Sequence, residues 1–178
     1  MKTSYWIACG VSAFISACGG GSDPTSVDVQ EKAPPVPGPE FSAALPARIG
    51  CSFALLIEAT GGKRVINEQG LRIINAGKGS TLTFSRIDDS VSPPIILESV
   101  TLQSNGSVTR TTPNPDGTEL VVATGHNVFV LFPGDVPQGP LTRLYIGRVE
   151  YIFNPETTEL RILNSSGQQI DVCAMIAP

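Results

Sequence analysis

Hydrophobic and polar residues alternate in short segments throughout residues 41–178. In the segment 81–87, for example, Leu82 and Phe84 alternate with Thr83 and Ser85. A period of two is typical of a β-strand with one buried face. Clusters of Gly, Pro, Asn and Ser separate the segments and mark turns. Because no window combines a sustained apolar period of 3.6 residues with helix caps, the pattern predicts an all-β fold. We expect an antiparallel meander of about nine or ten short strands, folded as a barrel or a sandwich.

Several glycine-containing segments are expected to reverse the chain. Hairpin turns are predicted at residues 60–63 and 104–106, where the sequence reads TGGK and SNG. His126 follows Gly125 between the predicted strands 119–124 and 127–132, so it is expected at the tip of a hairpin.

The N-terminal segment has a composition of its own. Lys2 precedes an apolar run over residues 5–17. This run is shorter than the roughly 20 residues of a membrane-spanning helix, and it has the layout of a secretory signal peptide.

The end of this run, Ile15-Ser16-Ala17-Cys18, resembles the lipobox of bacterial lipoproteins. The resemblance implies removal of residues 1–17 and lipidation of Cys18 as the new N-terminus. Cys9 also follows small residues, but it would leave too short an apolar region. Gly19 stands where Asp would retain a lipoprotein in the inner membrane, so the resemblance implies an outer-membrane anchor with the domain facing the periplasm or the cell surface. The mature region is similar to small β-rich lipoproteins of unknown function.

Residues 18–40 are predicted to form a tether that carries the lipidated cysteine. Five Pro and four Gly lie among residues 19–40, with few large apolar side chains. Such a segment cannot bury enough surface to offset its ordering entropy. The expected organisation is therefore a signal peptide at 1–17, a tether at 18–40 and one β domain at 41–178.

The charge balance argues against a nucleic-acid partner. The chain has 12 Lys and Arg against 16 Asp and Glu, for a net charge of -4. Nucleic-acid-binding domains normally carry a basic footprint. Residues 41–178 are nearly neutral, with ten basic and twelve acidic residues.

Two of the four cysteines remain for the domain once Cys9 and Cys18 are assigned to the signal peptide and the lipid. Cys51 and Cys173 lie in the first and last predicted strands, 51–59 and 168–176. An even pair in an oxidising compartment predicts a disulfide, which would bring the two terminal strands together. A structural zinc site is the alternative, but it needs four ligands and the chain has one histidine.

Catalytic motifs are sparse. His126 would have to be the base of a Ser-His-Asp site, yet no G-x-S-x-G sequence accompanies it. A glycosidase needs a pair of carboxylates in a cleft, and two of the three residues Glu58, Glu98 and Glu150 could form one. Their positions are explained more simply as ordinary charged residues on strands. Arg148 and Glu150 are expected on one face of a strand.

Ligand-binding motifs are sparse as well. Asp88-Asp89 and Asp116 fall in predicted turns without the spacing of a calcium loop, and Gly77 and Gly79 are not followed by a helix that could bind phosphate. We therefore expect no metal ion and no other cofactor. Tyr145 and Tyr151 share one face of a strand, where packing in the core or on the sheet surface is more plausible than a ligand platform.

Two functional hypotheses follow. The first is a non-catalytic outer-membrane lipoprotein whose domain binds another envelope protein. The alternative is a lipocalin-like carrier of a small apolar ligand. A filled core would favour the first hypothesis, and a central cavity with polar groups at its mouth would favour the second.

Overall fold

The computed structural model describes residues 35–38, 40–69 and 72–178. The chain divides into two units, Met1–Lys32 and Ala33–Pro178, and every described residue belongs to the second. The predicted signal peptide, Cys18 and most of the predicted tether lie outside the described residues. Two residues of the segment 18–40, Val36 and Pro37, form a short strand.

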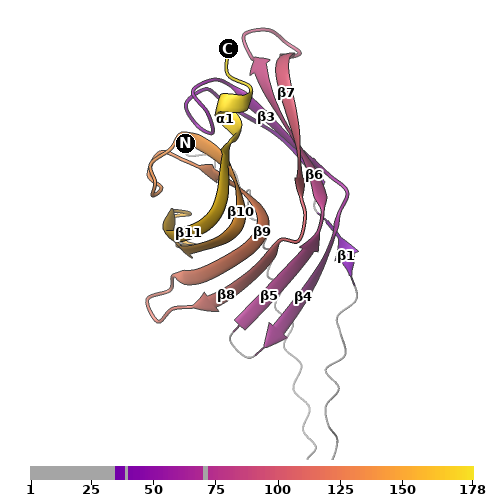
Figure 1. The fold of residues 1–178 in the computed structure, drawn as a ribbon. Coiled ribbons are helices and arrows are strands. Elements are labelled where there is room, and N and C mark those ends of the chain that lie inside the picture. The colour runs from indigo at the N-terminus through magenta and orange to yellow at the C-terminus, as the bar shows by residue number, and fades with distance from the viewer. Residues whose placement is uncertain (1–34, 39, 70–71) are drawn as a thin grey trace, which may run out of the picture. The chain divides into compact units, whose positions relative to one another are not determined.

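The described residues form an all-β antiparallel fold, which confirms the predicted fold class (Figure 1). They form two sheets that do not close into a barrel. The larger sheet has the strand order β1-β4-β5-β8-β9-β10-β11, and the smaller sheet has the order β2-β3-β6-β7. The elements are β1 (Val36–Pro37), β2 (Phe41–Leu45), β3 (Leu55–Thr60), β4 (Lys63–Gln69), β5 (Arg72–Lys78), β6 (Ser80–Asp88), β7 (Ile95–Ser104), β8 (Val108–Pro113), β9 (Glu119–Leu131), β10 (Leu141–Phe153), β11 (Leu160–Asp171) and α1 (Val172–Met175).

The two sheets are joined by strands that continue from one into the other. β3 passes into β4 across Gly61-Gly62, β5 passes into β6 across Gly79, and β7 passes into β8 across residues 105–107. In the small sheet β3 pairs with β6, and in the large sheet β4 pairs with β5. The predicted reversals at 60–63 and 104–106 are therefore wrong, because the glycines there bend a continuing strand. A glycine with positive φ is compatible both with a hairpin turn and with a bend in a continuing strand.

A row of glycines marks this bend across the whole meander. Gly125 of β9, Gly147 of β10 and Gly167 of β11 are directly paired neighbours. A Cβ on Gly125 would collide with the carbonyl oxygen of Gly106, and a Cβ on Gly147 would collide with that of Ser166. Gly147 also has a φ of 138°, which side-chain-bearing residues rarely adopt. The row continues through Gly38, Gly61, Gly62, Gly79 and Gly106.

The bend folds strands β9, β10 and β11 over themselves, as their strong curvature in Figure 1 shows. The residues enclosed by the fold form a core cluster of Ala123, Phe129, Leu131, Tyr145 and Val149, packed against Leu141, Tyr151, Leu160 and Ile162. The Phe129 ring lies edge to face with both tyrosines, at centroid distances of 5.4 Å to Tyr145 and 5.2 Å to Tyr151. The predicted packing role of these two tyrosines is confirmed.

A buried carboxylate fastens the fold of these strands. The Asp135 side chain, in the loop between β9 and β10, accepts hydrogen bonds from the Phe132 N–H at 2.6 Å and the Leu160 N–H at 2.8 Å. Val136 then forms a parallel bridge with Arg161. The loop at one end of β9 is thus held against the start of β11.

Two further predictions about local structure need correction. Residues 119–131 form the single strand β9, so His126 lies within a strand and not at a hairpin tip. Cys51 lies in the loop between β2 and β3, and Cys173 lies in helix α1, so neither cysteine is in a strand. The Asp171 side chain caps this helix by accepting a hydrogen bond from the Ala174 N–H, which ends β11 and begins a helical turn.

Candidate interaction surface

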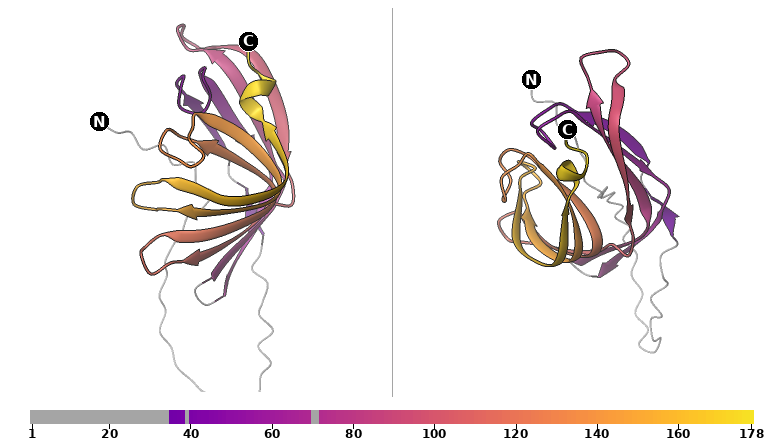
Figure 2. Two further views of the ribbon diagram at one scale, coloured as in Figure 1. Left: turned by 60° about the vertical axis from the view of Figure 1, so that its left-hand side comes forward. Right: turned by 45° about the horizontal axis from the view of Figure 1, so that its top comes forward.

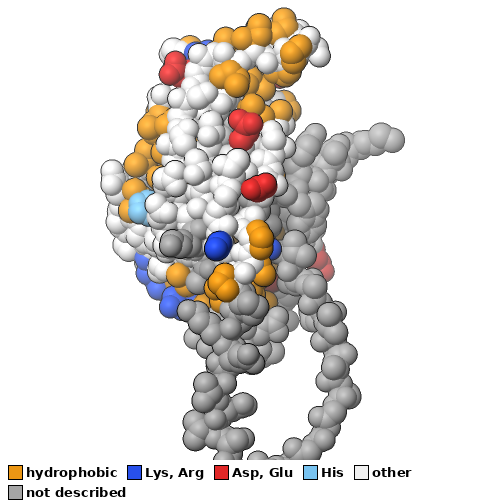
Figure 3. Space-filling model, turned by 90° about the vertical axis from the view of Figure 1, so that its right-hand side faces the viewer, with side chains coloured by type: hydrophobic (Ala, Val, Ile, Leu, Met, Phe, Trp, Pro, Cys, Tyr) orange, Lys and Arg blue, Asp and Glu red, His pale blue; other side chains and the backbone are white. Residues whose placement is uncertain are grey.

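The β6–β7 hairpin ends in an apolar tip that the rest of the fold leaves uncovered. Its exposed fractions are 42% for Val91, 54% for Ile95, 56% for Ile96 and 48% for Leu97. Successive residues of a strand face opposite sides, so exposure of three in a row means that both sides of the tip are open. Both views in Figure 2 show the hairpin projecting past the neighbouring strands, and Figure 3 shows hydrophobic side chains gathered at this end.

The same strand has an unpaired edge. β7 is the last strand of the small sheet, and among the described strands it pairs with β6 alone. It is ten residues long, and residues 95–99 are all exposed. Natural edge strands are usually short or protected by Lys, Pro or a bulge. β7 contains neither Lys nor Pro. It carries one irregularity, a β-bulge at Leu97, because Arg86 pairs with Glu98 and the next residue, Ile87, pairs with Ile96.

Acidic residues surround the apolar tip. Asp88, Asp89 and Glu98 are the charged residues between positions 88 and 98, and no basic residue lies in that segment. Hydrogen bonds from the Ser90 hydroxyl, at 2.6 Å, and the Ser90 N–H, at 3.0 Å, lower the pKa of Asp88 below its ordinary value. This carboxylate therefore stays charged at neutral pH.

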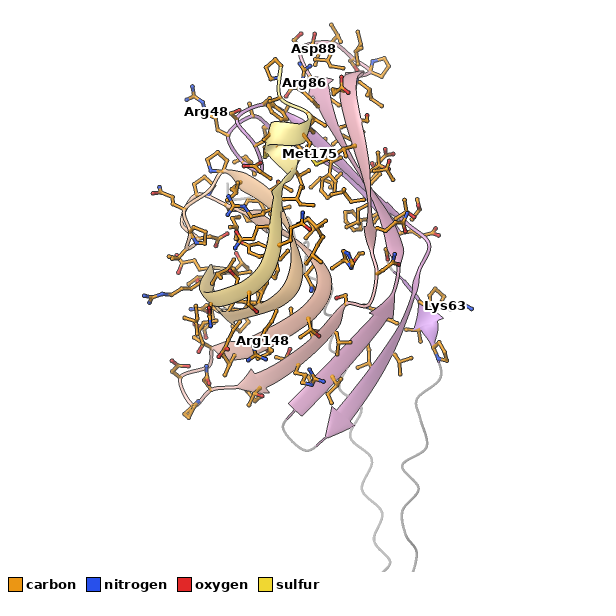
Figure 4. The ribbon with its side chains drawn as sticks, in the orientation of Figure 1. Arg48, Lys63, Arg86, Asp88, Arg148 and Met175 are labelled. Atoms are coloured by element: carbon orange, nitrogen blue, oxygen red, sulfur yellow. A yellow bond between two sulfur atoms is a disulfide. The ribbon has the colours of Figure 1, made fainter. Side chains whose placement is uncertain are left out.

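The nearest cation in the sequence is already engaged. Arg86 precedes the tip on β6, and its Nε donates a hydrogen bond of 2.9 Å to the carbonyl oxygen of Ile176, just after α1. Figure 4 shows Arg86 and Asp88 at this end of the molecule, beside the helix that carries Met175. Arg86 keeps its positive charge and lies opposite Glu98 in the strand register. Residues 86–98 therefore carry one basic and three acidic side chains, and the tip offers a partner apolar side chains and a net negative charge.

Uncharged polar side chains pair across β6 and β7 on one face of the small sheet. The Ser85 and Ser99 hydroxyls lie 2.8 Å apart, and the Thr83 and Thr101 hydroxyls lie 3.2 Å apart. These side chains satisfy one another across β6 and β7. Among the described strands, the side of β7 away from β6 has no strand partner.

A disulfide joins the loop between β2 and β3 to helix α1. Cys51 and Cys173 are bonded, with Cα atoms 5.6 Å apart and a sequence separation of 122, and Cys51 is fully buried. The buried Thr142 hydroxyl donates a hydrogen bond of 2.9 Å to the Gly50 carbonyl oxygen. These contacts join the loop between β2 and β3 to β10 and α1. The predicted pairing is confirmed, although its elements are a loop and a helix.

The predicted catalytic candidates do not come together. Glu58 and Glu98 lie on β3 and β7 of the small sheet, whereas Glu150 lies on β10 of the large one. Glu150 forms an ion pair of 3.0 Å with Arg148 of the same strand. His126 Nδ1 lies 2.9 Å from the Asn105 carbonyl oxygen.

The predicted turn carboxylates serve local structure. Asp116 accepts hydrogen bonds from the Thr118 hydroxyl and N–H, which lower the pKa of its carboxyl. No group of three or more His, Cys, Asp or Glu side chains suited to a metal ion occurs among the described residues.

The apolar tip was missed at the sequence level, although a signal for it was present. Pro93-Pro94 is followed by Ile95, Ile96 and Leu97 without alternation. Three consecutive apolar residues at the start of a strand depart from a period of two.

Comparisons with protein families, with curated proteins and with solved structures found no match for this chain. Within the described part of the chain, no helix is both long enough and apolar enough to span a membrane.

Proposed function

We propose that this protein is a non-catalytic, lipid-anchored domain of the bacterial envelope that works by binding another protein. The observation that carries the proposal is the exposed β6–β7 tip with its open strand edge. Soluble domains rarely leave contiguous apolar surface uncovered unless it serves an interaction. Three adjacent apolar residues, each about half exposed, form such a surface.

The lipobox supports the envelope location. Cys18 follows a signal-like segment and two small residues, and Gly19 follows it. Lipid chains on Cys18 would anchor the protein to the outer membrane, with the tether between the anchor and the domain. This half of the proposal is tested by labelling cells with a palmitate analogue. The wild type should incorporate the label and Cys18→Ser should not, so equal labelling of the two would refute the anchor.

The aromatic cluster inside the folded strands supports a binding domain over an apolar-ligand carrier, because its rings occupy space that a ligand would need. Phe129, Tyr145 and Tyr151 occupy the space inside the folded strands β9–β11 with direct ring contacts. A carrier needs an internal cavity of about 300 Å³ or more for its ligand.

Site-specific crosslinking in cells tests the binding role. A photoreactive benzoylphenylalanine replaces Leu97 at the tip, and a control carries it in place of the exposed Glu156 in the β10–β11 turn. We expect a discrete crosslinked envelope protein from position 97 and none from position 156. The same products from both positions, or none from position 97, would contradict the proposal.

A further inference from the structure

We propose that β7 binds its partner as an added β-strand: an extended segment of apolar residues and Lys or Arg that pairs with the open edge of the small sheet. This inference rests on the proposed binding function and specifies the partner's chemistry.

The backbone of β7 favours a strand as the occupant. In an antiparallel pair, about half of a strand's N–H and C=O groups point to one neighbour and half point to the other side. Along Ile95–Ser104 every residue except the bulged Leu97 has a partner on β6, and β7 is terminal in its sheet among the described strands. An extended peptide satisfies such a row of donors and acceptors and places alternate side chains on the two faces of the sheet.

The side chains of the tip favour apolar contacts at one end of that strand. Ile95, Ile96 and Leu97 are each about half exposed, whereas Val100 and Leu102, further along β7, are less exposed. Apolar residues of an added strand would cover the first three. Their contact with water would be lost, which stabilises the complex by roughly 25 cal/mol for each Å² buried.

The charges of the tip favour a basic segment. Asp88 and Asp89 lie at the end of the hairpin, and Glu98 follows the apolar residues on β7. An added Lys or Arg would meet these carboxylates with complementary charge. An anionic membrane surface would be repelled by them. Pairing of β7 with β7 of a second copy would instead concentrate like charges, which is destabilising.

The test uses the full-length protein in detergent and three fluorescent nine-residue peptides. The first alternates Val and Lys, the second alternates Val and Glu, and the third is the Val-Lys peptide with its central Val replaced by Pro. Binding is followed by fluorescence anisotropy. We expect saturable binding of the Val-Lys peptide, weaker binding of the Pro peptide because a ladder hydrogen bond is lost, and none of the Val-Glu peptide.

Variants of the protein locate the binding. The double variant Asp89→Lys with Glu98→Lys should weaken binding of the Val-Lys peptide by about tenfold or more and allow binding of the Val-Glu peptide. The matched control Glu156→Lys should change binding less than twofold, on the order expected for a distant surface charge. Circular dichroism of each variant establishes that it is folded.

Several outcomes would overturn the inference. These are equal binding of the acidic and basic peptides, equal binding of the Pro peptide, no effect of the double charge reversal, preferential binding to anionic vesicles, or dimerisation through Leu97 in analytical ultracentrifugation. The crosslinking at position 97 is independent of peptide chemistry. A crosslinked envelope protein together with failed peptide discrimination would therefore reject the added strand and leave the proposed function standing.

Discussion

Phe129 and Tyr151 are in edge-to-face contact, with ring centroids 5.2 Å apart, although the strand register separates them widely. Phe129 pairs with Arg143, and Tyr151 lies eight residues further along β10, which is roughly 26 Å in an extended strand. The two rings can meet only because β9 and β10 fold over between these positions. The core of the large sheet therefore forms because the sheet bends and brings these distant residues into contact.

Removal of the Phe129 ring should cost the most stability of any single core truncation in this region. Phe129→Ala removes both ring contacts and leaves a cavity, so we expect a loss of about 3 to 5 kcal/mol in the free energy of unfolding. Urea denaturation of the full-length protein measures it. Leu163→Ala, at a residue 51% exposed on β11, should stay within about 0.5 kcal/mol. Similar losses in both variants would show that Phe129 does not hold the folded strands together.

Gly147→Ala should destabilise the protein more than a positive φ alone explains. Gly147 and Gly117 both have φ in the left-handed range, at 138° and 85°. An added Cβ would collide with the Ser166 carbonyl oxygen at Gly147 and meet nothing within 4 Å at Gly117. We expect Gly117→Ala to cost about 1 to 2 kcal/mol from backbone strain and Gly147→Ala to cost clearly more. An equal decrease in melting temperature for the two variants would show that the predicted collision with the Ser166 carbonyl oxygen does not destabilise the protein.

Loss of the Cys51–Cys173 bridge should weaken the whole domain. The bond closes a loop across 122 residues of sequence, for which the chain-entropy model gives a stabilisation of about 4 to 5 kcal/mol. The double variant Cys51→Ser with Cys173→Ser should show this loss in chemical denaturation. Reduced wild-type protein serves as a second comparison, and free thiols at both positions in unreduced exported protein would contradict the bridge.

Asp135 should be required as a double hydrogen-bond acceptor. Its two carboxylate oxygens accept from the Phe132 and Leu160 N–H groups, and the residue is 5% exposed. Asp135→Asn retains one acceptor and presents an NH₂ group to the other N–H, which leaves a buried donor unsatisfied at a cost of about 1 to 3 kcal/mol. Hydrogen exchange at the Leu160 amide should accelerate in this variant. Unchanged protection of that amide would show that Asp135 does not fasten the loop to β11.

The alternating pattern was sufficient to predict the all-β class, most of the strands and their antiparallel pairing. It was insufficient at the glycines, because a residue with positive φ can reverse a strand or bend it, and the neighbouring residues are polar in both cases. Whether the strand continues depends on partners distant in sequence, such as β6 for β3.

Helix α1 was missed for a related reason. The apolar residues 170, 172, 174 and 176 alternate like a strand, but the two most deeply buried, Val172 and Ile176, are also one helical turn apart. A short apolar run is ambiguous between the two periods. The Asp171 side chain caps the helix by accepting a hydrogen bond and so favours a helical turn over a strand. The spacing of apolar residues does not predict this hydrogen bond.

The glycine row also has a consequence for the alignment of the strands during folding. Pairing of β10 with β11 sets Gly147 opposite Gly167, and pairing with β9 sets it opposite Gly125. A slip of one residue would bring Ile146 or Arg148 to the bend, where a side chain would press against a neighbouring carbonyl. Misaligned strands would therefore be unable to fold over, and the aromatic core would not form. The glycine row therefore selects the correct strand register, because only strands paired in that register can bend and form the core.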